Sequence, residues 1–408
     1  MLDATKLQGP RDSMKQVKFN GTGAEYFKIW IINLILCIIT FGIYYPWAKV
    51  RTRRYFYANT EYADRFFDYH ATGKQLFFGY LIGVCILIVL NIISAIFPTA
   101  GFILPVILFF FVPWIIWRSL KFNMRMTSFS NVRFSFDGSL KTAYFIYMLI
   151  PIAIYIAIIV LMVVGFASMA GFSNMSDVNM DSINTGGIVI FGIAVILALV
   201  LMVYMTGLLA KKSAEYQIGE TRFGQGRFFI NVNTKTFVMI AFKTALISVV
   251  SLVLFMTFIG LSFSSMLSGE VGGSVGNSAA SSFFMGSFFI VYIGFIAASL
   301  FAAAYTYSRQ RQYIYANTTL DQTIRFKSSV GAKAYFGVLI TNMLLIIVTL
   351  GFGMPWAKVR VAQYLADNTW IDAEDMDINQ YLTQKEQHQS AIGEEIGDVL
   401  DIDINIAI

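Results

Sequence analysis

The chain is poor in charge. Only 13% of its 408 residues are charged, whereas 57% are hydrophobic; ordinary soluble domains carry about 25% charged residues. Apolar runs recur along the sequence, several of them near the roughly 20 residues needed to cross a bilayer core. These runs carry almost no polar face, which excludes a large soluble helical core. The sequence therefore predicts a polytopic membrane protein.

Cysteine, histidine and recognisable catalytic motifs are scarce as well. Cys37 and Cys85 both lie inside apolar runs, so the sequence supports neither a disulfide framework nor a cysteine metal site. His70 and His388 have no ligand-like neighbours in sequence. Residues 21–23 read Gly-Thr-Gly but lack the Gly-Lys-Ser/Thr ending of a phosphate loop. We expect no enzymatic activity, no catalytic residues, no metal and no cofactor.

Ionisable groups are nearly absent from the apolar segments. Lys243 lies near the start of one segment, and Glu25 and Lys28 lie at the edge of another. Ion-coupled carriers place acids or bases at mid-membrane, so this pattern disfavours such a mechanism and leaves a passive path open. Asn33 and Asn342 are intramembrane amides at matching places. We expect them to pack between segments, by hydrogen bonds to a neighbour or to freed backbone.

The loops between the apolar segments alternate in charge. Loops 48–75, 118–143, 210–236 and 305–335 are basic, whereas the intervening loops hold no base. Basic loops face the cytoplasm in most membrane proteins; the first 26 residues are polar and resemble no cleavable signal. No nucleic-acid module accompanies the charge, so we expect membrane lipids rather than nucleic acid as partners. The apolar segments are expected at 27–46, 76–97, 102–117, 144–168, 188–209, 237–263, 283–304 and 336–356.

The C-terminal tail, residues 372–408, is acidic. It holds ten acids and one lysine, a net charge of −9, which leaves +15 on residues 1–371. Residues 401–407 alternate as Asp-Ile-Asp-Ile-Asn-Ile-Ala, a period typical of a strand. We expect this strand to pair with a basic hairpin, or the tail to stay disordered. The tail is also the candidate docking site for a protein partner; the sequence predicts no oligomeric state.

One stretch of the chain occurs twice. Residues 27–60 return as residues 336–369 with twelve identities in register, including the hexapeptide Pro-Trp-Ala-Lys-Val-Arg at 46–51 and 355–360. A helix breaker recurs inside each copy, and we expect it to turn the chain back. The residues expected at these two breaks are Gly42, Pro46, Trp47, Gly351, Pro355 and Trp356.

A second motif occurs five times: a basic residue, three residues, an aromatic, four residues and a threonine. Arg-Phe follows four of the copies, and Lys18-Phe19 stands at the same place before the first unit. Short alternating stretches with turn residues then predict small hairpins. The chain therefore reads as an all-α polytopic membrane protein of six to eight transmembrane segments in pseudo-repeated units, with small cytoplasmic β-hairpins. The five units span 17–60, 65–127, 133–221, 227–318 and 325–369.

Units one and five hold one apolar segment each, flanked by bases on both sides. A full crossing would place the two matching motifs in opposite compartments. We therefore expect these segments to enter and return on the cytoplasmic side, or to lie along it. The alternative is eight ordinary spans.

The basic and aromatic residues of the five motifs lie four apart and would share one helix face at headgroup level. They are candidates for binding a lipid headgroup or a small anion; the plainer interpretation is interfacial anchoring. The candidates are Lys49, Arg51, Tyr55, Arg118, Phe122, Lys212, Tyr216, Arg309, Tyr313, Lys358, Arg360 and Tyr364.

With both Pro-Trp-Ala-Lys-Val-Arg motifs and the Tyr-x-Tyr-Ala-Asn-Thr pattern at 55–60 and 313–318 in view, the chain resembles the YjgN family of bacterial inner-membrane proteins. The resemblance covers nearly the whole chain and implies a multi-pass protein of the bacterial inner (cytoplasmic) membrane. Together these features favour a non-enzymatic protein that handles lipid headgroups or passively transports a small anionic solute. The alternative is a structural or regulatory membrane module whose acidic tail docks a partner.

Overall fold

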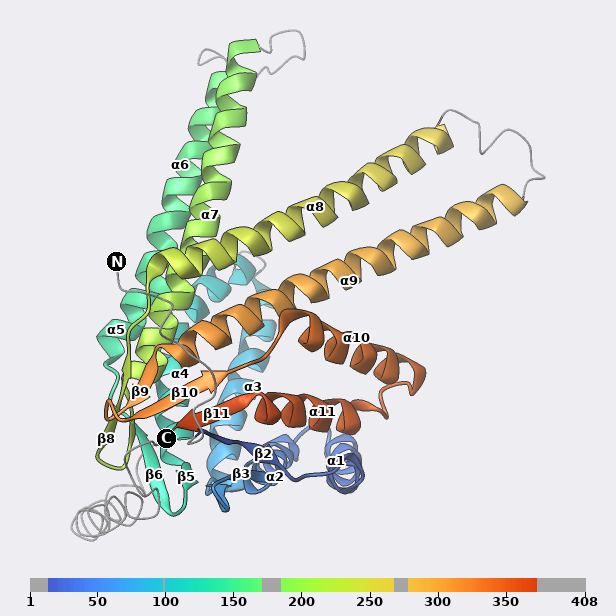
Figure 1. Ribbon diagram of the computed structural model, residues 1–408. Coiled ribbons are helices and arrows are strands. Elements are labelled where there is room, and N and C mark those ends of the chain that lie inside the picture. The colour runs from blue at the N-terminus through green and yellow to red at the C-terminus, as the bar shows by residue number, and fades with distance from the viewer. Residues whose placement is uncertain (1–13, 98–99, 171–184, 268–277, 373–408) are drawn as a thin grey trace.

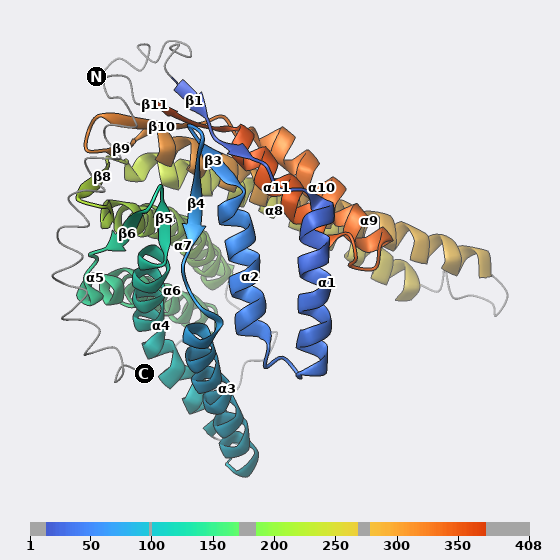
Figure 2. The same ribbon diagram turned by 90° about the horizontal axis from the view of Figure 1, so that it is seen from below.

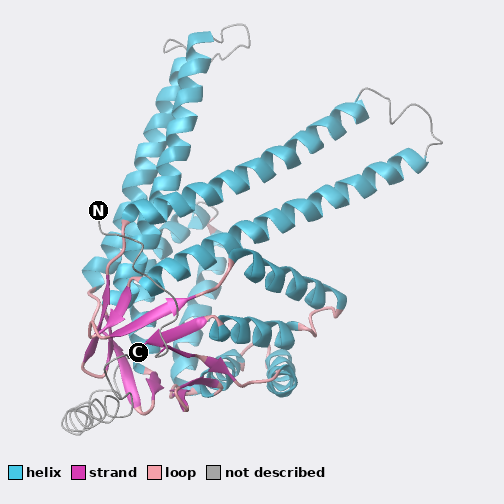
Figure 3. Cartoon of the chain, in the orientation of Figure 1, coloured by secondary structure: helices cyan, strands magenta, loops and turns pink. Residues whose placement is uncertain are grey.

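The structure is a computed structural model that describes residues 14–97, 100–170, 185–267 and 278–372. Its strands gather at one end of the molecule, and its helices fan out from them (Figures 1 and 3). The strands are β1 Met14–Gln16, β2 Lys18–Phe19, β3 Thr60–Tyr62, β4 Arg65–Tyr69, β5 Thr127–Phe129, β6 Val132–Phe136, β7 Thr221–Phe223, β8 Gly226–Ile230, β9 Thr318–Leu320, β10 Ile324–Ser328 and β11 Thr369–Asp372.

The helices occur in antiparallel pairs, each of which leaves the strands and returns to them. Units one and five hold the short pairs; unit three begins with a helix that contains one π-helical turn. The helices are α1 Gly23–Ile39 and α2 Tyr45–Ala58; α3 Gly73–Ile96 and α4 Ala100–Arg125; α5 Leu140–Tyr144, η2 Phe145–Leu149 and α6 Ile150–Ala170 with α7 Thr185–Gly219; α8 Thr234–Leu267 and α9 Ser278–Ala316; α10 Ala332–Val348 and α11 Met354–Asp367.

The eleven strands form one antiparallel sheet that closes on itself. Its order runs β1-β11-β10-β9-β8-β7-β6-β5-β4-β3-β2, and the two end strands are separated in sequence by Val17 alone. The Val17 amide donates to the Thr369 carbonyl, and the Asn20 amide donates to that of Asn59. One N-terminal segment therefore joins unit five to unit one, and we call the result the β ring.

The all-α prediction is thus wrong in part, because the expected hairpins merge into this ring. A single two-stranded hairpin is marginal in water, and its unpaired edges invite aggregation. Strands β3 to β11 each have two hydrogen-bonded neighbours, and the end strands β1 and β2 are joined to each other through Val17. Tight turns connect the two strands within a hairpin: Ala63-Asp64 and Ser130-Asn131 take left-handed backbone angles, the conformation that two-residue hairpin loops require.

Apolar side chains fill the centre of the β ring. The first strand of each of four hairpins, β3, β5, β7 and β9, has a buried third residue. These residues are at most 7% exposed: Tyr62, Phe129, Phe223 and Leu320. Ring centroids lie 6.2 Å apart between Tyr62 and Phe129 and 6.3 Å apart between Phe129 and Phe223. Burial, with the Asp372 carboxylate nearby, raises the pKa of Tyr62 to about 12. Its phenol therefore stays protonated and donates to the Ile371 carbonyl at 3.4 Å.

Six helical segments among the described residues are long and apolar enough to cross a membrane. The two short pairs, α1/α2 and α10/α11, are not among them. At about 1.5 Å per residue, the 17 residues of α1 give a helix shorter than a hydrocarbon core of about 30 Å. The candidate spans are Gly73–Ile96, Pro105–Arg125, Leu140–Ser168, Thr185–Gly219, Thr234–Leu261 and Gly286–Ala316.

The two short pairs turn in the same way. Phe41 and Gly42, like Leu350 and Gly351, take positive φ angles of 50°, 86°, 49° and 94°, and a proline is the second residue of the returning helix in each pair. The turns are apolar yet exposed: Phe41 is 96% exposed and Leu350 89%. In Figure 2, α1 and α2 lie side by side with the turn at the end far from the strands. The chain thus turns back within each short segment and returns to the β ring.

Each of the five unit ranges contains a strand, an outgoing helix, a returning helix and the first residue of the next strand. The strand expected at 401–407, and the acidic tail as a docking site, lie outside the described residues.

Ring closure by β1 gives a direct test. Gln16 and Trp370 are directly opposed in the β1–β11 register. In a background without Cys37 and Cys85, the pair Gln16→Cys/Trp370→Cys should form a disulfide in the oxidised protein, seen as a mobility shift on non-reducing gels. The pair Lys15→Cys/Trp370→Cys is the control, since neighbouring strand residues point to opposite faces. Equal cross-linking of both pairs would contradict the closure.

Candidate functional site

The threonine of the fivefold motif ends a helix and begins a strand. In every copy its hydroxyl donates to the carbonyl four residues earlier, at 2.6 to 2.9 Å. That carbonyl has no amide partner within the ending helix. This capping role accounts for the threonine at each place. The five residues are Thr60, Thr127, Thr221, Thr318 and Thr369.

The aromatic residue of the motif ties the two helices of its own unit together. The Tyr55 and Tyr216 hydroxyls donate to the carbonyls of Thr22 and Ser139, each at 2.9 Å. Those residues are the N-caps of the outgoing helices α1 and α5.

Units four and five use the same tether at the start of their outgoing helices. The Asn233 amide donates to the Tyr313 hydroxyl at 2.8 Å, and the Tyr364 hydroxyl donates to the Gly331 carbonyl at 3.4 Å. Phe122 stands at this position in unit two and packs in an apolar cluster with Val50. The aromatic candidates thus point into the protein.

The basic residues of the motif do not share one environment. Arg51 donates to the Tyr44 hydroxyl at 3.3 Å, and Arg360 donates to Thr341 at 3.3 Å. Lys212 pairs with Glu215 at 3.0 Å. Arg309 lies over the Tyr305 ring, 5.7 Å from its centroid. The remaining basic candidates, Arg118, Lys49 and Lys358, are exposed on α4, α2 and α11.

In units one, four and five, the position three residues after the basic residue joins the unit to the next one around the β ring. Arg54, Gln312 and Gln363 donate to the carbonyls of Ala71, Val330 and Gly21, at 3.3, 2.9 and 3.2 Å. Each acceptor precedes the N-cap of the next outgoing helix. The Trp117 indole makes the corresponding bond from unit two, to Gly138 at 2.7 Å. Sequence reasoning missed these junctions; a polar residue at this offset in all five copies was the available signal.

The tryptophan of each Pro-Trp-Ala-Lys-Val-Arg motif forms a junction too. A Cβ on Gly73 would lie 2.1 Å from the Trp47 ring, and one on Gly23 would lie 2.3 Å from the Trp356 ring. The two tryptophans also contact Phe77 and Phe27, with centroids 5.1 and 5.2 Å apart. Unit one is thereby packed against unit two, and unit five against unit one.

Asn33 and Asn342 clamp the two short helix pairs. Both side chains are buried, and their amides donate to the carbonyls of Ala48 and Ala357 at 3.4 and 3.0 Å. Each bond therefore joins the outgoing helix to the returning one inside a Pro-Trp-Ala-Lys-Val-Arg motif.

A basic cleft of about 680 Å³ opens between α8 and α9 of unit four. Of the described residues that line it, three are basic and none is acidic. Two of its residues, Arg309 and Tyr313, belong to the fivefold motif. The other two basic residues, Lys235 and Lys243, come from α8; both lie in the candidate span Thr234–Leu261, Lys235 near its start and Lys243 further in. The lining consists of Lys235, Thr236, Met239, Ile240, Lys243, Tyr305, Arg309, Gln312 and Tyr313.

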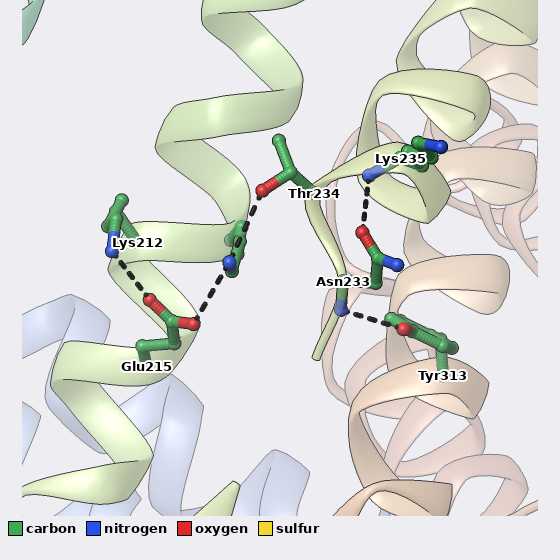
Figure 4. Close-up of polar contacts among 7 residues, drawn as sticks. Lys212, Glu215, Asn233, Thr234, Lys235 and Tyr313 are labelled. Carbon is green, nitrogen blue, oxygen red and sulfur yellow. Dashed lines mark hydrogen bonds and ion pairs between the residues drawn. The ribbon is translucent and has the colours of Figure 1, made fainter. Parts of the chain in front are cut away.

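Beside the cleft, Glu215 lies between two lysines of α7. Its carboxylate contacts Lys211 at 3.4 Å and Lys212 at 3.0 Å. The Lys211 ammonium also reaches the Thr234 hydroxyl at 3.2 Å, which joins unit three to unit four. Figure 4 shows Glu215 beside Lys212, with Asn233 joined to Tyr313 on the other side of Thr234. The charge of the α7 lysines is thus partly compensated by an acid, whereas the described lining of the cleft holds no acid.

Comparison with known proteins agrees with this architecture. The family model described as "Bacterial protein of unknown function (DUF898)" matches residues 14–399. The chain belongs to this family. It is 30% identical to the inner membrane protein YjgN of Salmonella typhimurium over 364 residues, 87% of this chain and 88% of the relative. It is 28% identical to the YjgN protein of Escherichia coli O157:H7 over 367 residues, 86% and 87% of the two chains. No solved structure matches the chain.

The tryptophan–glycine junctions predict a position-specific loss of stability. Gly73→Ala places a methyl group against the Trp47 ring and should lower the free energy of unfolding by about 1–3 kcal/mol, as overpacking does. Thermal unfolding of the detergent-solubilised protein measures this. Gly79→Ala in the same helix is the control, because a Cβ there meets nothing within 4 Å. Equal melting temperatures for the two variants would rule out the junction.

Proposed function

We propose that this protein is a non-enzymatic, multi-pass protein of the bacterial inner membrane that binds anionic lipid headgroups in the cleft of unit four. The observation that carries the proposal is the composition of the cleft, whose described lining holds three basic residues and no acid. Apolar Met239 and Ile240 lie in the same lining, as a site for a headgroup and the start of its acyl chains requires.

Electrostatics supports an anionic occupant. Lys235 lies in the first turn of α8, where the helix dipole already makes the potential positive and acids would be the favourable side chains. Lys243 lies eight residues further into the candidate span Thr234–Leu261. Cations at that depth are costly and mark functional sites in membrane proteins. Negative charge of lipid headgroups in the cleft would lower these costs.

The packed β ring argues against a solute path along its axis. Phe129, Phe223 and Leu320 fill its centre, so a passing solute would have to displace the core. Lipid handling is therefore the better-supported branch of the hypothesis. The alternative of a module that docks a partner depends on the acidic tail, which lies outside the described residues.

We further propose that the β ring lies on the cytoplasmic side and that α1/α2 and α10/α11 enter one leaflet and return. Their exposed apolar turns, Phe41 and Leu350 among them, would insert into hydrocarbon. The basic loops, which adjoin the β ring, would then lie at the cytoplasmic headgroups.

Topology mapping tests this placement. A reporter fused after Asp377 should read as cytoplasmic, as should a cysteine at Asp64 in the β3–β4 turn. A membrane-impermeant thiol reagent applied to whole cells should label Leu350→Cys no better than a cysteine within a candidate span. A periplasmic reading after Asp377 would contradict the re-entrant arrangement.

Removal of cleft charge should weaken lipid binding. The double variant Lys235→Gln/Arg309→Gln should lower retention of phosphatidylglycerol by about tenfold or more, since each hydrogen-bonded charge contributes about 1.5–3 kcal/mol. Native mass spectrometry of the purified full-length protein measures it. The matched control is Lys333→Gln/Arg360→Gln, which removes the corresponding charges of unit five. Equal retention in both double variants would refute the cleft as the site.

A further inference from the structure

The three basic residues of the cleft, Lys235, Arg309 and Lys243, form a column along α8 and α9. The inference drawn from this column rests on the proposed lipid binding. Lys235 and Lys243 stand two turns apart on one face of α8, a separation of about 12 Å along the axis. Met239 lies one turn from each, and all three line the cleft. The two lysines therefore mark the ends of the column.

The position of Arg309 along the axis of α8 follows from two contacts between α9 and the neighbouring segment, one on either side of Arg309. On α9, Tyr313 accepts the hydrogen bond of Asn233 at 2.8 Å, and Thr306 contacts Thr244 through their hydroxyls at 2.6 Å. Because α9 runs antiparallel to α8, a residue midway between 306 and 313 lies midway between the levels of 244 and 233. Arg309 thus stands at the level of Met239, between the two lysines.

One phosphate group cannot neutralise the whole column. A phosphate that bridges Lys235 and Arg309 leaves Lys243 without a counter-ion, deeper in an apolar segment. If the Lys243 stem bends toward the headgroups, as long basic side chains do near helix ends, its ammonium approaches Arg309 and meets a like charge. A second phosphate removes this conflict in either position.

The column is a property of unit four alone among the five units. The outgoing helices of units two, three, four and five carry a lysine in the first turn: Lys74, Lys141, Lys235 and Lys333. Eight residues later, only α8 carries a second cation. In unit five that position is Thr341, which accepts a hydrogen bond from Arg360 at 3.3 Å. The other corresponding residues are Ile32 in unit one, Ile82 in unit two and Leu149 in unit three.

We propose that the cleft of unit four selects a lipid that bears two phosphate groups over a lipid that bears one. The outer phosphate contacts Lys235 and Arg309, and the inner phosphate contacts Arg309 and Lys243. The Thr244–Thr306 hydroxyl pair lies at the inner end of the column. Acyl chains leave the cleft over Met239 and Ile240 toward the bilayer.

The test compares cardiolipin, which has two phosphates, with phosphatidylglycerol, which has one. The full-length protein is placed in nanodiscs with either lipid at equal total phosphate, and bound lipid is counted by native mass spectrometry after release. The wild type should prefer cardiolipin by about tenfold. Lys243→Gln should remove that preference and leave phosphatidylglycerol binding within about twofold, whereas Lys235→Gln should weaken both lipids. Thr341→Val is the control at the matching position of unit five and should change neither.

The outcomes separate the two proposals. Retention of both lipids with equal affinity, or a preference that survives in Lys243→Gln, overturns the two-phosphate selectivity and leaves headgroup binding intact. Retention of neither lipid above an unrelated membrane protein overturns the proposed function itself. Inorganic diphosphate is added as a competitor; if it binds as tightly as cardiolipin, the occupant is a soluble anion, which overturns the lipid assignment.

Discussion

Closure of the β ring is the constraint on which the rest of the molecule depends. Strands of two to five residues are too short to persist as separate hairpins, so they need further strand pairing. The closed sheet pairs β3 to β11 on both sides and joins the end strands β1 and β2 through Val17. It also buries the apolar residues at its centre, which are Tyr62, Phe129, Phe223 and Leu320. The ring then fixes the direction in which every helix pair leaves, and the threonine caps and tyrosine tethers hold each pair to its own strands.

The basic cleft arises where the pseudo-symmetry is broken. All units share the cap, and four of the five share a hydroxyl-mediated tether at the same place. In these common contacts the motif's threonine caps a helix and its aromatic residue joins the two helices of its unit, so both have structural roles. What distinguishes unit four is Lys243, a cation at a depth where the other units hold isoleucine, leucine or threonine. A repeated scaffold thus carries the site in one copy only: Lys235, Arg309 and Tyr313 stand at repeated positions, and Lys243 is the cation that the repeat does not specify.

Much of the architecture could be predicted from the sequence, because periodicity and repeats report it. The apolar runs predicted the membrane class, and the return of residues 27–60 as 336–369 predicted two matching segments that turn back at Gly42/Pro46 and Gly351/Pro355. Closure of the ring could not be predicted, since hydrogen bonds between strands some 350 residues apart leave no local pattern. The inward role of Tyr55 was missed for a similar reason: its partner Thr22 is distant in sequence, while its neighbour Arg51 is close.

The measurement that tests this account most directly is photo-crosslinking of native lipids from within the cleft. The photoreactive residue p-benzoylphenylalanine would replace Met239, and in a separate variant Phe78, which stands one turn after Lys74 as Met239 does after Lys235. The adducts formed in intact membranes would be identified by mass spectrometry. The account predicts anionic lipid enriched at position 239 and bulk membrane lipid at position 78. The same bulk composition at both positions would contradict it.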